Sequence, residues 1–443
     1  MAIATHTLAT LIQKLAESCS DWLSFSTTTN LTTDNYVIST TLSEYDESED
    51  NHFGGADTEW WVYITGTANV GIVRRTSDYS AASTRITIEG AALAAESAAA
   101  TCQLFRYNRT AYKKAIIEAC TEVYDSLYLP VEDITLITGN ILPDASFEDW
   151  SASTTLTWYS VVTGALAQTS AAGSTRNGKY SAKFTDSTAA GYFYVSSKTY
   201  PRLLDLQGQT IDLYCWAYPE VADDATMSIY TINAAGSTQT LPTTTANPAT
   251  TWTMLKLESQ VLNDDLVEVQ VRFNVATNLK YVIFDDAMVQ GRNIYEYLLP
   301  EKIRDGNLDN LYMQTSGNYD PACYDYHPFS TLSPGRELSF DIVDNATDRY
   351  VKVGSTLPTE RRLRLLGKTP LETLSAETDT ITLDAWRVPR LINKARMIFW
   401  EREVMPISSQ DKSRFDFEYA KAERDYRKSS RLSMPQSARK IRI

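Results

Sequence analysis

The sequence predicts an α+β fold in which one domain of helices and strands, split along the chain, carries an inserted antiparallel β-sandwich. Helical spacing of apolar residues occurs near both ends of the chain, next to runs of β-branched and aromatic residues. The stretch 139–292 is almost free of helical pattern. A length of 443 residues exceeds what one core usually serves, so roughly two or three domains are expected.

The composition is typical of a folded protein that is rich in strands and contact surfaces. Hydrophobic residues make up 43% and charged residues 22%, while 26 Tyr and 9 Trp suit sheets and interfaces. The net charge of −14 repels nucleic acid, so sequence-specific DNA recognition is not expected, although DNA sliding past is compatible with it. No CxxC pair, signal peptide or membrane-spanning run is apparent, which predicts a reduced protein with no membrane partner.

The N-terminal part, 1–138, is predicted to contain two helices with strands between them. Leu8, Leu11, Ile12 and Leu15 form an apolar stripe at helical spacing, and Thr5 or Thr7 is the expected cap. The second helix is expected over 109–128 and ends before Pro130. Four strands are expected between the two helices, over 36–38, 60–64, 71–73 and 85–88.

The middle part, 139–292, alternates apolar and polar residues between turn signals. These signals include Ala172-Gly173, Asn177-Gly178 and Gln207-Gly208. The pattern predicts an antiparallel sandwich.

The third part, 293–429, returns to the style of the first part and is expected to complete the same domain. Short strands are expected over 337–342 and 350–353, then a long helix over 383–403 and a more polar helix over 409–429. Pro389 lies within the first turns of the long helix, where proline is tolerated.

A basic C-terminal arm, 430–443, follows and contrasts with the acidic chain. The expected partner-binding residues of the arm and the helix before it are Arg424, Arg427, Lys428, Arg431, Arg439, Lys440 and Arg442. Three interpretations stay open: a solvated end, a peptide that orders on an acidic partner, and direct contact with phosphate.

The middle part resembles the carbohydrate-binding-module-like jelly rolls found beside many glycosidases. The resemblance lies in the opening segment 140–150, the stretch 178–184, and the closing strand 282–287, which contains an Asp-Asp pair. It implies sugar contacts from strand aromatics, although aromatics that alternate along strands more often belong to a core or an interface. These aromatics are Tyr192, Tyr194, Tyr214, Trp216, Tyr218 and Tyr230. It also implies a structural calcium held by Glu148, Asp285 and Asp286; otherwise these acids cap turns in solvent.

The outer parts are similar in element order to head-to-tail adaptors of tailed bacteriophages. The features that carry this resemblance are the first helix, the helix around 112–127, the long helix 386–400, the polar helix and the basic tail. It implies a structural virion protein of the neck, made in the host cytoplasm. Its expected partners are copies of itself in a ring, expected to be a dodecamer, the portal protein, a tail or tail-terminator protein, and genomic DNA that passes without sequence recognition.

No enzyme is predicted. Only His6, His52 and His327 are histidines, and no Walker A, HExxH, GxSxG or GxGxxG motif occurs. We therefore expect no catalytic residues and no cofactor other than the calcium that the resemblance implies. Two alternatives to the adaptor stay open: a carbohydrate-binding adhesin or baseplate component that uses the sandwich, and a tail-tube or tail-completion protein.

Overall fold

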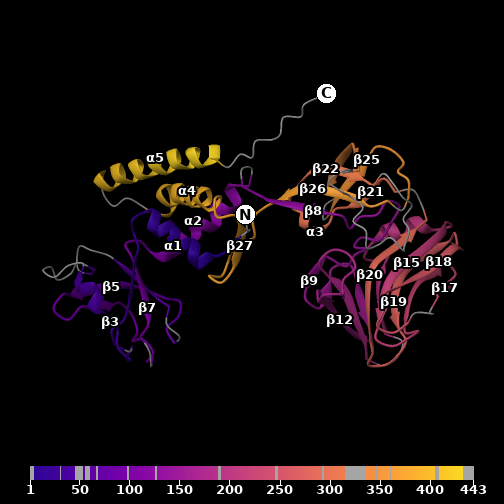
Figure 1. The fold of residues 1–443 in the computed structure, drawn as a ribbon, viewed down its shortest axis with the longest axis horizontal. Coiled ribbons are helices and arrows are strands. Elements are labelled where there is room, and N and C mark those ends of the chain that lie inside the picture. The colour runs from indigo at the N-terminus through magenta and orange to yellow at the C-terminus, as the bar shows by residue number, and fades with distance from the viewer. Residues whose placement is uncertain are drawn as a thin grey trace. The chain divides into compact units, whose positions relative to one another are not determined.

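The chain forms two compact units, of residues 1–129 with 370–443 and of residues 130–369 (Figure 1). The structure is a computed structural model. It describes residues 4–29, 31–44, 53–54, 60–65, 68–96, 99–124, 127–187, 191–244, 248–291, 294–314, 335–344, 348–359, 361–404 and 409–432.

The fold is mostly β, so the predicted α+β class with a helical and β adaptor domain is wrong. Strands hold 42% of the described residues against 20% in helices, and the sheets are antiparallel. The reason lies mainly in the segment after the sandwich. The described strands between residues 296 and 369 pair with one another and with β8, from before the sandwich, within the second unit, rather than completing a helical domain.

Helices from both ends of the chain pack together in the first unit. They are α1 (Leu8–Ser18), α2 (Arg109–Glu122), α4 (Val388–Ile398) with the π-helical turn η4 (Phe399–Glu403), and α5 (Ser409–Leu432). The predicted stripe of α1 is fully buried, and Thr7 caps the helix by accepting a hydrogen bond from the Thr10 amide. The Tyr112 and Phe399 rings stack with centroids 4.3 Å apart, which joins α2 to the end of α4.

The long helix predicted over 383–403 begins five residues later than expected. Residues Thr380–Leu383 form strand β27, which pairs antiparallel with β1 (Ala4–Thr7) at the other end of the chain. Pro389 lies in the first turn of α4, as predicted. Among the described residues, no helix is both long and apolar enough to cross a membrane.

A six-stranded antiparallel sheet completes the first unit, in the order β2-β7-β4-β5-β6-β3. Its strands are β2 (Leu23–Ser26), β3 (Tyr36–Ile38), β4 (Trp61–Ile64), β5 (Ile72–Ser80), β6 (Arg85–Ile88) and β7 (Thr101–Phe105), and the 3₁₀-helix η1 (Thr40–Glu44) follows β3. The four predicted strands of this region are confirmed as β3, β4, β5 and β6.

The second unit contains a sandwich of two five-stranded antiparallel sheets, ordered β11-β14-β19-β16-β17 and β12-β13-β20-β15-β18 (Figure 1). The strands of the first sheet are β11 (Ser160–Val162), β14 (Gly191–Ser196), β16 (Ala225–Asn233), β17 (Thr238–Pro242) and β19 (Leu266–Val275). Those of the second are β12 (Gly164–Thr169), β13 (Ser181–Asp186), β15 (Thr210–Pro219), β18 (Thr253–Val261) and β20 (Tyr281–Gln290). A hairpin of β9 (Trp150–Ala152) and β10 (Thr155–Leu156) precedes them, and the 3₁₀-helix η2 (Pro201–Leu206) follows β14.

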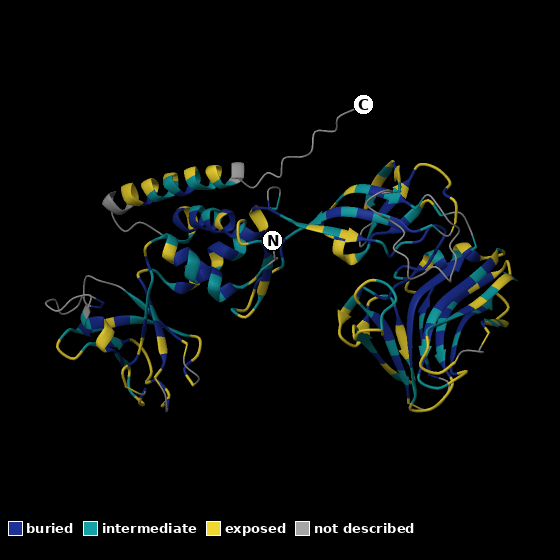
Figure 2. Cartoon of the chain, viewed as in Figure 1, coloured by how far each residue is buried: buried dark blue, intermediate teal, exposed yellow. Residues whose placement is uncertain are grey.

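Aromatic side chains from both sheets fill the sandwich core. Phe147, Phe193, Phe273 and Phe284 are fully buried, and the Phe193 and Phe273 rings stack at 4.8 Å. Buried residues alternate with partly exposed ones along several of these strands, as Figure 2 shows. The strand pairing therefore confirms the predicted jelly-roll sandwich.

A smaller lobe in the second unit consists of two further sheets and a short helix. One sheet has the order β21-β25-β24, from β21 (Glu296–Leu298), β24 (Phe340–Asp344) and β25 (Arg349–Val353). The other has the order β23-β22-β26-β8, from β8 (Leu129–Asp133), β22 (Asn307–Met313), β23 (Arg336–Leu338) and β26 (Leu363–Thr369), and α3 (Glu301–Arg304) precedes β22. The expected domain boundaries at 138/139 and 292/293 both lie inside this unit.

Candidate functional site

The outer face of the sheet β11-β14-β19-β16-β17 carries tyrosines next to a row of polar side chains. Tyr192 and Tyr194 alternate along β14 with Phe193, which lies in the core. Both tyrosines therefore point away from the core, and both are partly exposed. Their ring centroids lie 5.7 Å apart.

The polar row follows the central strand β19. The Gln270 amide donates to Glu268 Oε1 over 2.7 Å, and Arg272 Nε donates to Gln270 Oε1 over 2.8 Å. Further along, the Asn274 amide donates to Ser228 Oγ on β16 over 3.0 Å. These hydrogen bonds fix the orientation of the polar groups on the face.

Arg272 lies between tyrosines of the two neighbouring strands. Its Cζ atom is 3.6 Å from the centroid of the Tyr230 ring on β16 and 4.7 Å from that of Tyr192 on β14. Cation–π contacts of this kind hold the guanidinium flat against aromatic faces. Three predicted aromatics, Tyr192, Tyr194 and Tyr230, thus share one surface with Arg272.

Charge at one end of the row is balanced locally. Lys198 Nζ lies 2.7 Å from Glu268 Oε2, and this hydrogen bond lowers the pKa of Glu268 and raises that of Lys198.

Arg272 and Gln270 were not singled out from the sequence. The alternation of polar residues with Val269, Val271 and Phe273 along β19 was the signal that could have identified them.

The other predicted aromatics lie on the opposite sheet. Tyr214 is almost fully buried beside Ile137 and Met288. Arg176 Cζ lies 4.1 Å from the centroid of the Trp216 ring, and the ring centroids of Tyr218 and Trp252 are 5.7 Å apart. These three residues of β15 therefore do not join the surface around Arg272.

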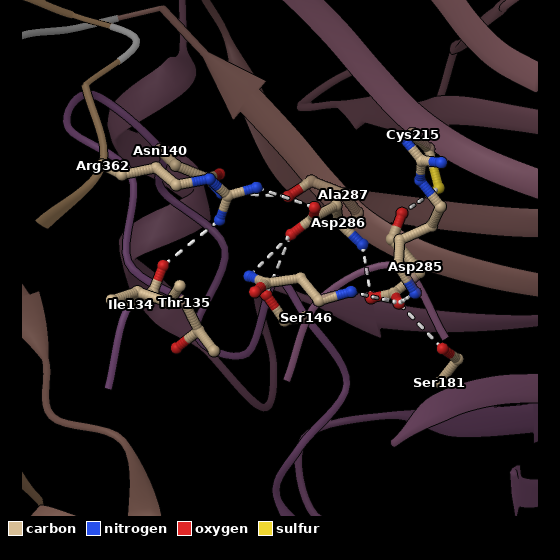
Figure 3. Close-up of polar contacts among 12 residues, drawn as sticks. Ile134, Thr135, Asn140, Ser146, Ser181, Cys215, Asp285, Asp286, Ala287 and Arg362 are labelled. Carbon is tan, nitrogen blue, oxygen red and sulfur yellow. Dashed lines mark hydrogen bonds and ion pairs between the residues drawn. The ribbon is translucent and has the colours of Figure 1, made fainter. Parts of the chain in front are cut away.

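The predicted calcium ligands Asp285 and Asp286 lie side by side on β20, surrounded by hydrogen-bond donors (Figure 3). Asp285 Oδ2 accepts from the Ser181 hydroxyl and from the Arg176 and Asn177 amides, and its Oδ1 accepts from the Asp286 amide. All four groups donate a hydrogen bond to the carboxylate, so they occupy positions from which a metal ion would bind it.

Asp286 is paired with an arginine from the smaller lobe. Arg362 Nη2 lies 2.8 Å from Asp286 Oδ2, while Arg362 Nη1 donates to the Ile134 carbonyl over 3.2 Å (Figure 3). The two side chains are 9% and 0% exposed. The positive charge at this position thus comes from a guanidinium.

Glu148, the third predicted ligand, binds other groups. Its Oε1 accepts from the Lys179 and Tyr180 amides, and its Oε2 lies 3.4 Å from Lys302 Nζ. No group of three or more possible metal ligands gathers within the part of the chain that the structure describes. The donors around these acids argue against calcium, and calcium binding by Glu148, Asp285 and Asp286 stays a prediction.

The predicted basic arm is described only in part. Arg424, Arg427 and Lys428 lie on α5, where Arg427 pairs with Glu423 at 2.5 Å. Arg431 falls in the last turn of α5, without a described side chain, and Arg439, Lys440 and Arg442 lie outside the described residues. Partner binding by this arm stays a prediction.

A cavity of about 460 Å³ lies in the second unit, lined by residues of the sandwich and of the smaller lobe. Its apolar wall includes Ile137 and Leu142. Arg202 and Lys352 of the lining share one carboxylate, since they lie 2.6 and 3.5 Å from Glu296. Asp205 also lines the cavity, so its two cations are matched by two carboxylates.

Solved structures similar to this chain overlap about a third of it. The C-terminal family 22 carbohydrate-binding module of Clostridium thermocellum Xyn10B is 15% identical with a TM-score of 0.29, covering 35% of this chain and 95% of that one. The CBM22-1 xylan-binding domain of Paenibacillus barcinonensis Xyn10C is 17% identical with a TM-score of 0.27, covering 37% and 97%. Bacteriophage CBA120 tailspike protein 4 is 11% identical with a TM-score of 0.26, covering 34% and 22%.

No family model matches the sequence, and no curated protein matches it. None of the three structures named above is a head-to-tail adaptor. At these identities and TM-scores, the similarity does not tell what this chain binds. The chain contains a jelly-roll domain, and its strand pairing is what establishes that fold.

Proposed function

We propose that the sandwich binds carbohydrate on the outer face of the sheet β11-β14-β19-β16-β17. The observation that carries this proposal is the placement of Tyr192, Tyr194 and Tyr230 around the hydrogen-bonded polar row of β19. The role is binding, and no catalytic residue is assigned.

The chemistry of the face suits a sugar. A pyranose has a weakly polar C–H face and a rim of hydroxyl groups, so it requires both an aromatic surface and directional polar partners. Tyrosine rings supply the first, and the amides of Gln270 and Asn274 with the Arg272 guanidinium supply the second. Because these groups already hydrogen-bond to one another, ordering them on binding costs little entropy.

Accessibility within the second unit also favours this face. Tyr192, Tyr194 and Tyr230 are all partly exposed. On the opposite sheet, the outward-facing Tyr214 is only 9% exposed, because Ile137 and Met288 cover it. A polysaccharide therefore has more room along β14 and β19 than along β15.

The full-length protein should bind one or more oligosaccharides on a glycan array, and calorimetric titration should then give the affinity. Replacing an aromatic anchor at the centre of a binding surface usually costs about 1–2 kcal/mol, so Tyr194→Ala should weaken binding about tenfold. Tyr218→Ala is the matched control, since it removes a tyrosine from the outer face of the other sheet and should leave affinity unchanged. Absence of binding to every glycan, or full affinity in Tyr194→Ala and Tyr192→Ala, would refute the proposal.

A ring-forming head-to-tail adaptor of a phage neck is a second candidate. One observation favours it: helices from both chain ends form a single unit, and this unit exposes the large apolar side chains Phe417 (66%) and Trp386 (41%). Exposed apolar residues of this size suit contacts between copies. The proposed partners are the portal, a tail protein and passing DNA, with the virion as location.

Mass measurement of the purified protein separates the two candidates. An adaptor should form a closed ring, expected to be a dodecamer, and deletion of residues 430–443 should abolish attachment to portal complexes without unfolding the protein. A monomer with normal glycan binding would leave only the first candidate.

A further inference from the structure

Arg272 is held in one orientation on the proposed carbohydrate-binding face. The guanidinium is stacked on Tyr230, and its Nε donates to Gln270, which in turn donates to Glu268. A stacked arginine with an anchored Nε has lost most of its rotational freedom before a ligand arrives.

Both Nη groups of Arg272 are available to a ligand. Among the residues that the structure describes, none accepts a hydrogen bond from either Nη, and Nε is the one guanidinium nitrogen with a described acceptor. The neighbouring carboxylate of Glu268 already accepts from Gln270 and lies 2.7 Å from Lys198 Nζ. Lys198 and Arg272 carry two positive charges and Glu268 carries one negative charge, so these three residues give the face one positive charge in excess.

We infer that the bound sugar carries a carboxylate, and that Arg272 is the residue that recognises it. This inference rests on the proposed carbohydrate-binding function. The paired Nη groups of an arginine match the two oxygens of a planar carboxylate, and such charge-assisted pairs are stronger than bonds to neutral hydroxyls. The ligand class is a glycan with uronic or sialic acid units.

The acidic surface of the whole chain does not oppose this assignment at physiological salt. The net charge of −14 repels an anionic glycan at long range. At an ionic strength of about 0.15 M the screening length is about 8 Å, so distant charges contribute little while the direct contact with Arg272 persists. Binding is therefore to be measured at that ionic strength.

The test uses the full-length protein on a glycan array containing uronate-, sialate- and sulfate-bearing oligosaccharides, each printed beside its neutral counterpart. For uronates and sialates the neutral counterpart is the carboxyl-reduced or methyl-esterified sugar. Wild type should prefer the carboxylate form, and Arg272→Gln should lose about tenfold to a hundredfold in affinity for it. The loss for the neutral form should be smaller, so the ratio of carboxylate to neutral binding should fall toward one. Arg272→Lys should recover only part of the loss, because an ammonium cannot form the paired contact.

A matched control keeps the result specific to the face. Lys183 on β13 lies over the Tyr281 ring at 4.0 Å on the other sheet, so Lys183→Gln removes a comparable stacked cation outside the site. This variant should keep the carboxylate preference. Unfolding midpoints of all variants should match wild type.

The possible outcomes separate the two proposals. Equal or better binding of neutral sugars overturns the carboxylate assignment and leaves the carbohydrate-binding function standing. Binding of wild type to sulfated glycans alone also overturns the carboxylate assignment, because the recognised anion would then be a sulfate. No binding to any glycan overturns the proposed function itself.

Discussion

At the scale of single residues, Arg362 supplies the positive charge beside Asp286. The resemblance seen in the sequence implies a calcium ion in that role. Asp286 is fully buried and lies 2.8 Å from Arg362 Nη2, which itself is 9% exposed. The Ser146 hydroxyl donates to the remaining oxygen of Asp286 (Figure 3), and so does the side-chain amide of Asn177. The pair joins the last strand of the sandwich to the start of β26 in the smaller lobe.

Removal of the guanidinium should destabilise the second unit strongly. Arg362→Met leaves Asp286 buried without a counter-charge, which typically costs about 3–5 kcal/mol of unfolding free energy. Denaturant unfolding of the full chain measures this in the transition of the second unit. Lys352→Met is the control, because Lys352 is 51% exposed in its contact with Glu296, which keeps its pair with Arg202, so Lys352 should contribute at most about 1 kcal/mol. Equal effects of the two substitutions would contradict the role of the pair.

At the scale of elements, the segment that opens the sandwich is organised around Asp144. Its two carboxyl oxygens accept from the Glu148 and Asp149 amides, each over 3.0 Å, and its carbonyl accepts from the Tyr159 hydroxyl over 2.9 Å. Burial raises the pKa of Asp144 from 3.8 to about 7. The local turn is therefore built on an acid that takes up a proton more readily when folded than when unfolded.

The sign of the pH dependence follows from this difference. Between pH 3.8 and about 7 the folded protein binds more protons at Asp144 than the unfolded chain, so the contribution of this residue to stability falls as pH rises through that window. Wild type compared with Asp144→Asn should show this loss as a difference in slope between pH 4.5 and 7.5, measured by denaturant unfolding. Parallel curves for the two proteins would show that Asp144 titrates normally.

At the scale of the whole molecule, each unit has its own buried apolar core. The helical core of the first unit draws on residues from both chain ends, including Leu11, Ile116 and Leu391. The second unit starts and ends on β8 and β26, which are neighbours in one sheet. The two ends of the second unit, near residues 130 and 369, therefore lie close together. A short linker could replace this unit and join residue 129 to residue 370.

A chain in which residues 130–369 are replaced by a short Gly/Ser linker should fold as the first unit alone. It should unfold cooperatively and keep its helical circular dichroism, because closing a short loop costs little entropy compared with burying this core. The matched control is Leu391→Ala in the shortened chain, which should lower its stability by about 2–5 kcal/mol. A non-cooperative product would show that the ends of the chain need the second unit in order to associate.

The sequence by itself determined the local elements, because these depend on the spacing of residues a few positions apart. The stripe from Leu8 to Leu15 specified α1, and the alternation along β14 and β19 specified strands of a sandwich. Partners far apart in the chain were decided only by the tertiary structure. It pairs Thr380–Leu383 with Ala4–Thr7, and this strand takes the place of the first residues of the predicted helix. It also pairs the strands after residue 296 into sheets, which add to the mostly β fold.

The candidate site divides in the same way. The aromatic residues were visible as a set, yet only the sheet order separates Tyr192, Tyr194 and Tyr230 from the tyrosines of β15 and places Arg272 among them. Likewise, the Asp-Asp pair was visible, but its partner Arg362 comes from a distant strand. The physical reason is that side-chain period is a local property, whereas contacts between distant strands depend on packing and loop closure over the whole chain.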